Sequence, residues 1–438
     1  MEIIFAIIYV ILVLLMMIAV IGFENDCKKI IFWNLVIVVT SILGFMVYLI
    51  WFCDKPSIKK EIQKKFNEDK IYKELNNFKL DEVTSKNEFF NFNRRHYEAG
   101  IFNRSSVKSI LKQDDFINSL ANDLDKASQY IMIETKTFLN AINNDNIVSL
   151  LKEKQTVGVE VKCVYNKLSY KDRAVLKELR LSGVKVCKFT KNNLNKYYKN
   201  AKNIIDIDGQ ISYIYDYCGV KNNKQNVVHS NIFFRVVGDV LKCIDLDCHQ
   251  DVSFANRKYY ELERKEYTAD GEMEMQYISS VVDKDFEGVF VKAINDAKKQ
   301  IIIHVNKFIP TPSIKQALRM AIMSGVEVKI MLSKANYSMN YYSSRAYIKE
   351  MAQYGGTSYI FDGFFDTNFV LIDNLSIIGN FSLVNLEIRN NLQNMLAVSN
   401  EKFNEELNSY FLKQVKNSYR ICKPKNELLR EKIFKKFN

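Results

Sequence analysis

In this 438-residue sequence, the type and spacing of the acidic residues at two turns suggest chemistry. One apolar β-like run ends at Asp208 and a second ends at Asp373, and in each case a turn residue and another apolar run follow. Together with Asp206 and Asp366, these carboxylates could bind a metal cation that prefers oxygen ligands. Acids at turns also cap backbone amides, and this simpler role is the one we expect. We therefore predict no metal site and no cofactor.

A second candidate pair combines one carboxylate with one imidazole. Glu134 and His304 end two short apolar runs in comparable places, Ile131–Glu134 and Ile301–His304. Such a pair can transfer protons near neutral pH if the fold brings both side chains to one site. Both can equally be ordinary polar residues at strand ends, and we treat the acid–base role as the less favoured reading.

The segments that must position these residues recur along the chain. Three of them reappear in the same order after about 165 to 170 residues. The pairs are Asp125–Glu134 with Asn295–His304, Gly158–Asn166 with Gly325–Ser333, and Lys199–Tyr217 with Phe364–Ser382. A period of this length indicates a duplicated domain, because the repeats of solenoids have roughly 20–50 residues.

Each copy alternates helix-like segments with short apolar β-like runs. This pattern predicts an α/β sandwich with helices on both faces of a mixed sheet. Two equivalent copies tend to pack around a pseudo-dyad, as identical subunits pack around a true one. We therefore expect two tandem repeats, residues 91–260 and 261–438, whose equivalent strand ends meet in a shared cleft.

The N-terminal region is apolar and differs from the rest of the chain. Ile3–Phe23 is an uncharged run of 21 residues, and a helix of that size is about 31 Å long, close to the roughly 30 Å of a bilayer core. Ile30–Cys53 is a second uncharged run with a tryptophan near each end, as at membrane interfaces. These runs predict a two-pass transmembrane hairpin over residues 1–53. The lysine-rich residues that follow predict a basic juxtamembrane helical linker over 54–90 and, by the positive-inside rule, a cytoplasmic globular part.

Composition narrows the partners and the compartment. The formal net charge of +12 favours an anionic partner, and a membrane-anchored chain makes an anionic phospholipid surface the better expectation than nucleic acid. Base stacking by the aromatic and basic stretch Asn336–Arg345 is the nucleic-acid alternative. The eight cysteines show no Cys-x-x-Cys spacing, which favours a reducing compartment over a disulfide scaffold.

Several motifs resemble those of bacterial cardiolipin synthases of the phospholipase D superfamily, and the resemblance covers essentially the whole chain. The segment AKNIIDIDG at 201–209 is similar to the family block HRKIxVIDG, and FFDTNFVLIDN at 364–374 is similar to FxHxKxxVIDx. Shorter similarities are FFRVVGD at 233–239 to HxRIxGxxV, HVNKFIP at 304–310 to TPYFxP, and NLEIR at 385–389 to N-L-D-x-R. The resemblance implies a fold of two tandem phospholipase D-like repeats.

The resemblance also implies a chemistry that rests on a His-x-Lys-x4-Asp motif in each repeat. One histidine attacks phosphorus, the other transfers protons, and the two lysines hold the phosphate oxygens. The equivalent positions here keep only the acids. They are Ala201, Asn203 and Asp208 in the first copy and Asp366, Asn368 and Asp373 in the second.

We therefore predict a membrane-anchored, catalytically degenerate relative of cardiolipin synthase. It would bind phospholipid or have an accessory role in membrane lipid metabolism, beside an active synthase or another membrane protein. The alternative is an active phosphatidyltransferase with rearranged catalytic residues, for which Glu134 and His304 are the candidates.

Overall fold

The computed structural model divides the chain into two compact units, residues 1–61 with 190–196 and residues 62–189 with 197–438. The residues that the structure describes are 2–23, 27–51, 85–137, 144–167, 172–189, 199–216, 230–256, 258–260, 267–268, 270–279, 286–334, 339–421 and 435. Most of the expected linker 54–90 and part of the stretch Asn336–Arg345 lie outside them.

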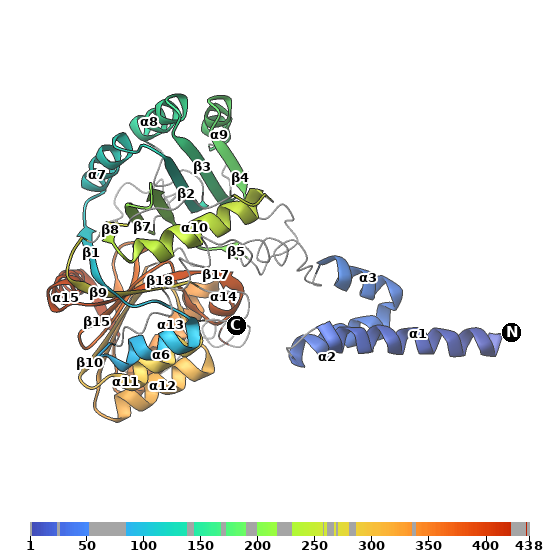
Figure 1. Cartoon of the computed structure of the whole chain (residues 1–438). Helices are drawn as coiled ribbons and strands as arrows, with labels where there is room; N and C mark the ends of the chain where they lie inside the picture. Colours follow the sequence, from blue (N-terminus) through green and yellow to red (C-terminus); the bar gives the residue numbers. More distant parts are fainter. Residues whose placement is uncertain are drawn as a thin grey trace. The chain divides into compact units, whose positions relative to one another are not determined.

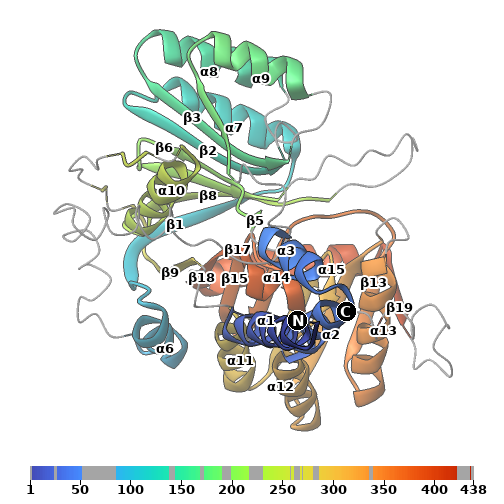
Figure 2. The same ribbon diagram turned by 90° about the vertical axis from the view of Figure 1, so that its right-hand side faces the viewer.

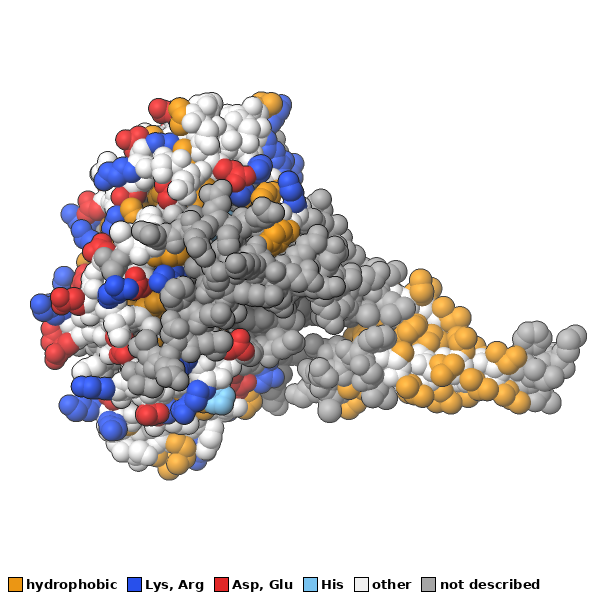
Figure 3. Space-filling view, in the orientation of Figure 1, with side chains coloured by type: hydrophobic (Ala, Val, Ile, Leu, Met, Phe, Trp, Pro, Cys, Tyr) orange, Lys and Arg blue, Asp and Glu red, His pale blue; other side chains and the backbone are white. Residues whose placement is uncertain are grey.

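The first unit contains three helices in its described part: α1 (Glu2–Phe23), α2 (Cys27–Thr40) and α3 (Ile42–Trp51). Val20, Trp33, Ile37 and Tyr48 form a small buried core between them. Most of the other described apolar side chains of these helices are exposed, as the orange surface in Figure 3 shows.

The predicted transmembrane hairpin is not supported. The second apolar run, expected as one span, is divided at Ser41, whose φ of 56° ends α2 and starts α3 as a separate helix. Among the described residues, no helix combines the length and the apolar character needed to cross a membrane. The orientation inferred from the two-pass topology is likewise not supported.

The second unit carries the elements expected from the repeated segments. Its first half, taken as residues 91–260, continues from α6 (Glu88–Tyr97) into seven long strands and four helices in the described part. They are β1 (Phe102–Ile110), α7 (Gln113–Asp125), β2 (Tyr130–Thr137), α8 (Asp145–Thr156), β3 (Glu160–Lys167), α9 (Asp172–Leu181), β4 (Lys185–Lys188), β6 (Ile204–Ile207), β7 (Ile211–Tyr215), β8 (Phe233–Gly238) and α10 (Leu241–Asn256), with the two-residue strand β5 (Lys199–Asn200) before β6.

The second half, residues 261–438, follows a similar order. Its described elements are β9 (Met273–Ser279), α11 (Glu287–Asp296), β10 (Gln300–Val305), β11 (Phe308–Ile309), α12 (Pro312–Met323), β12 (Glu327–Ser333), α13 (Met339–Tyr354), β13 (Thr357–Phe361), β14 (Asn368–Ile372), β15 (Leu375–Gly379), β16 (Leu383–Val384), α14 (Asn385–Asn390), β17 (Asn391–Leu392), β18 (Asn394–Ser399), α15 (Glu401–Val415) and β19 (Ser418–Ile421).

One mixed sheet runs through the whole second unit. Its strand order is β19-β13-β12-β10-β14-β15-β18-β9-β1-β8-β7-β6-β2-β3-β4. Outward from the central β9–β1 pair, each half has one strand (β18 or β8), then an antiparallel hairpin, and then three strands that are parallel to one another. In the first half the hairpin is β6–β7, and in the second half it is β14–β15. The α/β fold predicted from the alternating pattern is confirmed at this level.

Helices cover both faces of this sheet (Figures 1 and 2). Helices α7, α8 and α9 pack on one face of the first half, and α11, α12 and α13 pack on the second half. A third core joins the halves, because α10 and α15 contribute to it together with strands of both. Helix α6 precedes the first half in sequence, yet its Phe89 and Phe90 lie in the core of the second half.

Candidate functional site

The two turn acids have the same structural role in the two halves. The carboxylate of Asp208 accepts hydrogen bonds of 2.7–2.9 Å from the backbone N–H groups of residues 128, 129 and 130, where β2 begins. The carboxylate of Asp373 accepts bonds of 2.8–2.9 Å from residues 298, 299 and 300, where β10 begins. Both acids have positive φ values, 52° and 49°, which Asp tolerates better than most residues. Each acid therefore caps the backbone amides of a neighbouring strand.

The two asparagines at the lysine positions of the motifs are also used alike. The Asn203 side chain accepts a 2.8 Å bond from the N–H of Lys136 and donates a 2.8 Å bond to Asp216. The Asn368 side chain accepts a 3.0 Å bond from the N–H of Asn306 and donates a 2.8 Å bond to the carbonyl of Phe381. These amides are 3% and 6% exposed. Each accepts a bond from a backbone N–H near the end of a parallel strand, at Lys136 within β2 or at Asn306 just after β10.

The histidine positions hold side chains that are buried between the halves. Ala201 is 8% exposed, and its N–H donates a 2.7 Å bond to the carbonyl of Leu392. Just before it, β5 pairs in parallel with β17 of the second half. Asp366 is 4% exposed, and its N–H donates to the side chain of Asn231 at 2.9 Å. The first motif is thus bonded to the second half, and the second motif to the first half.

Asn380 connects the two motif regions directly. Its side-chain oxygen accepts a 2.8 Å bond from the N–H of Asn203, and its side-chain nitrogen donates a 2.8 Å bond to the carbonyl of Tyr215. Burial raises the pKa of the neighbouring Asp216 to about 7, with the positive charge of Lys136 opposing and the negative charge of Asp366 adding to the rise. The histidine- and lysine-equivalent positions of the two halves therefore meet at one junction, which we call the motif junction, whereas Asp208 and Asp373 lie at the other ends of β6 and β14.

Charged groups that the motif comparison did not single out also lie at this junction. Glu387 accepts hydrogen bonds from Lys307 at 3.1 Å and from Ser382 at 2.7 Å. Burial alone would raise the pKa of Glu387, but the charges of Lys307 and Lys136 lower it to about 2. The junction therefore contains lysines 136 and 307 and carboxylates 216, 366 and 387. Of these, Asp366 occupies a motif position, and Lys307 and Glu387 lie in the segments HVNKFIP and NLEIR that resemble the family.

Glu134 and His304 take equivalent places in the sheet but have different surroundings. Glu134 lies opposite Ile204 of β6, and His304 lies opposite Phe369 of β14. The fully buried His304 ring stacks on Phe365 and Phe369, and its nitrogens contact the Thr367 carbonyl at 3.0 Å and Gln414 at 2.7 Å. Burial lowers the pKa of His304 to about 4, so the ring is neutral at pH 7.

The side chain of Glu134 belongs to a buried charged cluster instead. It accepts a 2.7 Å hydrogen bond from Asn200, and burial followed by the charge of Asp251 raises its pKa well above the ordinary value. Among the contacts of the described residues, Glu134 and His304 share no partner. The structure does not bring them together as one acid–base pair.

Lys202 is the cation of that cluster. Its ammonium binds both carboxylate oxygens of Asp247 at 2.6–2.7 Å and Asp251 at 2.7 Å, and its side chain is 1% exposed. Asp247 also accepts bonds from Tyr277 and Ser279 of β9 at 2.6 and 2.9 Å. Because neighbouring residues of an extended chain point to opposite sides, Lys202 points away from Ala201 and Asn203. Its positive charge is neutralised by Asp247 and Asp251 of α10, so Lys202 does not replace a motif lysine.

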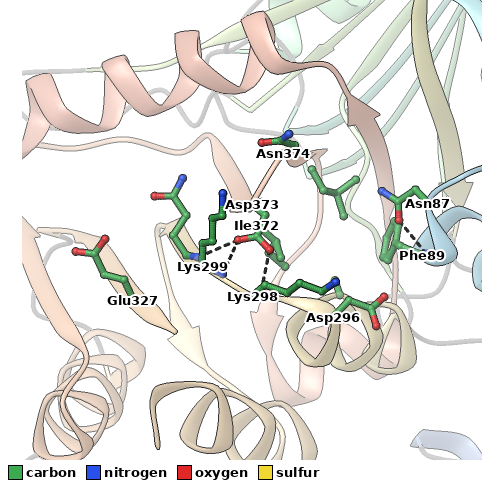
Figure 4. A pocket seen from close by; sticks show the side chains of 12 residues that line it. Asn87, Phe89, Asp296, Lys298, Lys299, Glu327, Ile372, Asp373 and Asn374 are labelled. Atoms are coloured by element: carbon green, nitrogen blue, oxygen red, sulfur yellow. Dashed lines mark hydrogen bonds between the residues drawn. The ribbon is translucent and has the colours of Figure 1, made fainter. Parts of the chain in front are cut away.

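A separate pocket of about 670 Å³ lies at the other end of β14, beside the Asp373 turn (Figure 4). It is formed by residues of α6, α11, β10 and β12 together with the turn between β14 and β15. Within the described residues, no group of three or more His, Cys, Asp or Glu side chains is arranged to hold a metal ion.

Comparisons with known proteins agree with the motifs. A family profile described as "Cardiolipin synthase, PLD-like domain" matches residues 290–415. The chain is 25% identical over 427 residues to the major cardiolipin synthase ClsA of Bacillus subtilis (strain 168), covering 89% of this chain and 86% of that protein. It is also 25% identical over 397 residues to a cardiolipin synthase of Oceanobacillus iheyensis, covering 82% and 80%.

Solved structures support the fold. The phosphatidylserine synthase of Haemophilus influenzae Rd KW20 superposes with a TM-score of 0.60 at 8% identity, covering 80% of this chain and 97% of that one. At such low identity the likeness concerns the fold alone. The resemblance to cardiolipin synthases of the phospholipase D superfamily is thereby confirmed, and the fold is an α/β fold of the phospholipase D type.

Proposed function

We propose that this chain is a catalytically degenerate cardiolipin synthase-like protein that binds phospholipid and has an accessory role in membrane lipid metabolism. The observation that carries this proposal is the set of residue types found at the motif junction. Its histidine and lysine positions hold Ala201, Asn203, Asp366 and Asn368, whose described contacts link strands and loops. The identity of these site residues rests on the motif comparison.

The chemistry of these side chains disfavours phosphatidyl transfer. Covalent catalysis needs an activated nucleophile, and a methyl group at Ala201 provides none. The neutral amides of Asn203 and Asn368 offer no positive charge to the phosphate oxygens. Asp366 adds a negative charge that repels a phosphodiester. Loss of the nucleophile alone costs hydrolases several orders of magnitude in rate.

Support for binding of anionic lipid comes from the chain as a whole, which carries a net charge of +12. At the junction itself, Lys136 and Lys307 lie among three carboxylates, and Lys307 is paired with Glu387. Anionic phospholipid, or the membrane surface that contains it, is therefore the partner we propose, with an active synthase or another membrane protein as a second partner.

We further infer that residues 91–260 and 261–438 arose by duplication. The shared strand order outward from β9 and β1 supports this inference, as do the matching roles of Asp208 with Asp373 and Asn203 with Asn368. Helix α6 lies at the boundary proposed between the linker and the first repeat.

One observation favours the alternative of an active transferase. Asp216 has a pKa of about 7 and lies at the junction near Lys136, where it could exchange protons at neutral pH. Such an enzyme would still need a nucleophile. Of the four histidines, His229 is two residues from Asn231 in sequence, and Asn231 bonds the backbone of Asp366, so His229 is the first to test.

Expression in a host without cardiolipin synthase separates the two functions. We expect lipid extracts analysed by mass spectrometry to contain no new cardiolipin or other phosphatidyl product, while the chain co-purifies with anionic phospholipid. A new product that disappears in Asp216→Asn or His229→Ala would establish the active alternative.

A further inference from the structure

The pocket beside the Asp373 turn combines exposed cations with an apolar base. Its volume of about 670 Å³ lies within the range of roughly 300–1,000 Å³ that is usual for small-molecule sites. Phe89 and Ile372 are buried parts of its lining, and Lys298 and Lys299 are exposed parts. In Figure 4 the two lysine side chains extend in different directions from the Asp373 carboxylate.

The carboxylates of this pocket already have partners. Asp296 is paired with Lys292 at 2.7 Å, and Glu327 is paired with Lys329 at 2.9 Å. Asp373 is occupied by three backbone N–H groups. By contrast, within the described residues neither Lys298 nor Lys299 forms a side-chain ion pair. The pocket therefore presents two lysines without an ion pair beside the one negative charge of Asp373, which the neutral N–H groups do not cancel.

The equivalent turn of the first half lacks these charges. The strand pairing that places Ile131 opposite Ile207 and Ile301 opposite Ile372 aligns residues 128 and 129 with residues 298 and 299. Ser128 and Gln129 donate their backbone N–H groups to Asp208 as the two lysines donate theirs to Asp373. Capping of the turn thus does not require lysine side chains, and their presence in the pocket needs a separate reason.

We propose that this pocket is a second phosphate-ester site, in which Lys298 and Lys299 hold the phosphate of a phosphoglycerol headgroup and the apolar base contacts its carbon atoms. The site is separate from the motif junction, since it lies at the opposite end of β14. The choice of a lipid headgroup over a free phosphate ester rests on the proposed lipid-binding function. The proposed contact between the lysines and a phosphate group does not depend on that function.

The test compares the wild-type chain with the double variant Lys298→Ser/Lys299→Gln, which gives the second turn the residues of the first and keeps the backbone donors to Asp373. The full-length protein is used in detergent. Because α1–α3 expose apolar side chains, monomeric dihexanoyl phosphatidylglycerol is a better probe than a vesicle. Calorimetric titrations use this lipid, dihexanoyl phosphatidylcholine and sn-glycerol 3-phosphate in parallel.

We expect phosphatidylglycerol to bind more tightly than phosphatidylcholine, and the double variant to lose about tenfold or more in affinity for it, as the removal of two lysines from an anionic headgroup predicts. The matched control is Lys402→Ala/Lys413→Ala, two exposed lysines of α15 outside the pocket. It should bind like the wild type.

Three results divide the possibilities. Equal affinity of the wild type and Lys298→Ser/Lys299→Gln, or an equal loss in the α15 control, overturns the site while leaving lipid binding in place. Binding of sn-glycerol 3-phosphate alone, lost in the double variant, supports the site with a free ligand and contradicts the lipid-binding function. Binding of the lipid, lost only in the double variant, supports both.

Discussion

The two halves of the second unit keep the same supporting residues and differ in what surrounds them. Asp208 and Asp373 each cap three backbone amides, and Asn203 and Asn368 each bind the backbone near the end of β2 or β10. In the first half the strand end carries Glu134 within a charged cluster, whereas in the second half it carries His304 within an aromatic stack. The residues that hold strands match between the halves, and the histidine and lysine positions of the family motif hold Ala201, Asn203, Asp366 and Asn368.

The largest expected effect concerns Lys202 and its counterpart Thr367. Lys202→Met leaves Asp247 and Asp251 buried without their cation, which should lower the free energy of unfolding by about 3–5 kcal/mol. Thr367→Val removes only a hydroxyl that bonds the backbone of Ile232 and should cost about 1–3 kcal/mol. Urea unfolding of both variants measures the difference. Equal losses would contradict the expectation that the buried ion pairs of Lys202 contribute more to stability than the hydroxyl of Thr367.

The next effect is a pair of opposite pH dependences. His304 has a lowered pKa of about 4 in the folded chain, so its stabilising contribution is present above its unfolded pKa of about 6.5 and is lost as pH falls toward 4. The full contribution is on the order of 3 kcal/mol. Glu134 has a raised pKa, so its contribution is present below about pH 4.5 and is lost as pH rises.

Thermal unfolding between pH 4 and 8 tests these signs. His304→Phe should weaken the rise of stability with pH, and Glu134→Gln should weaken the opposing fall. If both variants change the profile in the same direction, the contrast between the two strand ends is wrong.

A smaller and equal effect is expected at the two turns. Asp208→Ala and Asp373→Ala each leave three backbone N–H groups without their charged acceptor and should each lower stability by roughly 1.5–3 kcal/mol. Asp→Asn at either position keeps an oxygen acceptor and tolerates the positive φ, so it should cost less. Chemical unfolding of the four variants gives the comparison. A loss at only one turn would break the equivalence of the halves.

Sequence patterns predicted the features that depend on local order. Alternating helical and apolar segments indicated the α/β fold, and the period of about 165–170 residues agrees with equivalent places for the β6–β7 and β14–β15 hairpins in the sheet. The capping role expected for Asp208 and Asp373 follows from turn chemistry alone, and their backbone contacts agree with it.

Features that depend on distant pairing were missed. The partner of Lys202 lies 45 residues away on α10, and nothing in the local pattern of Ala201–Asn203 indicates it. Pairing of β5 with β17 joins residues far apart in sequence, as does the packing of α6 on the second half. The break of the second apolar run at Ser41 was also missed, since hydropathy does not report it.

The most direct measurement of the central claim is a search for the covalent intermediate. The full-length chain is incubated with phosphatidylglycerol, and its intact mass is measured at neutral pH, with an active cardiolipin synthase treated in parallel. We predict that the active synthase gains a phosphatidyl group and that this chain does not. A phosphatidyl adduct on this chain, at any histidine, would contradict the account.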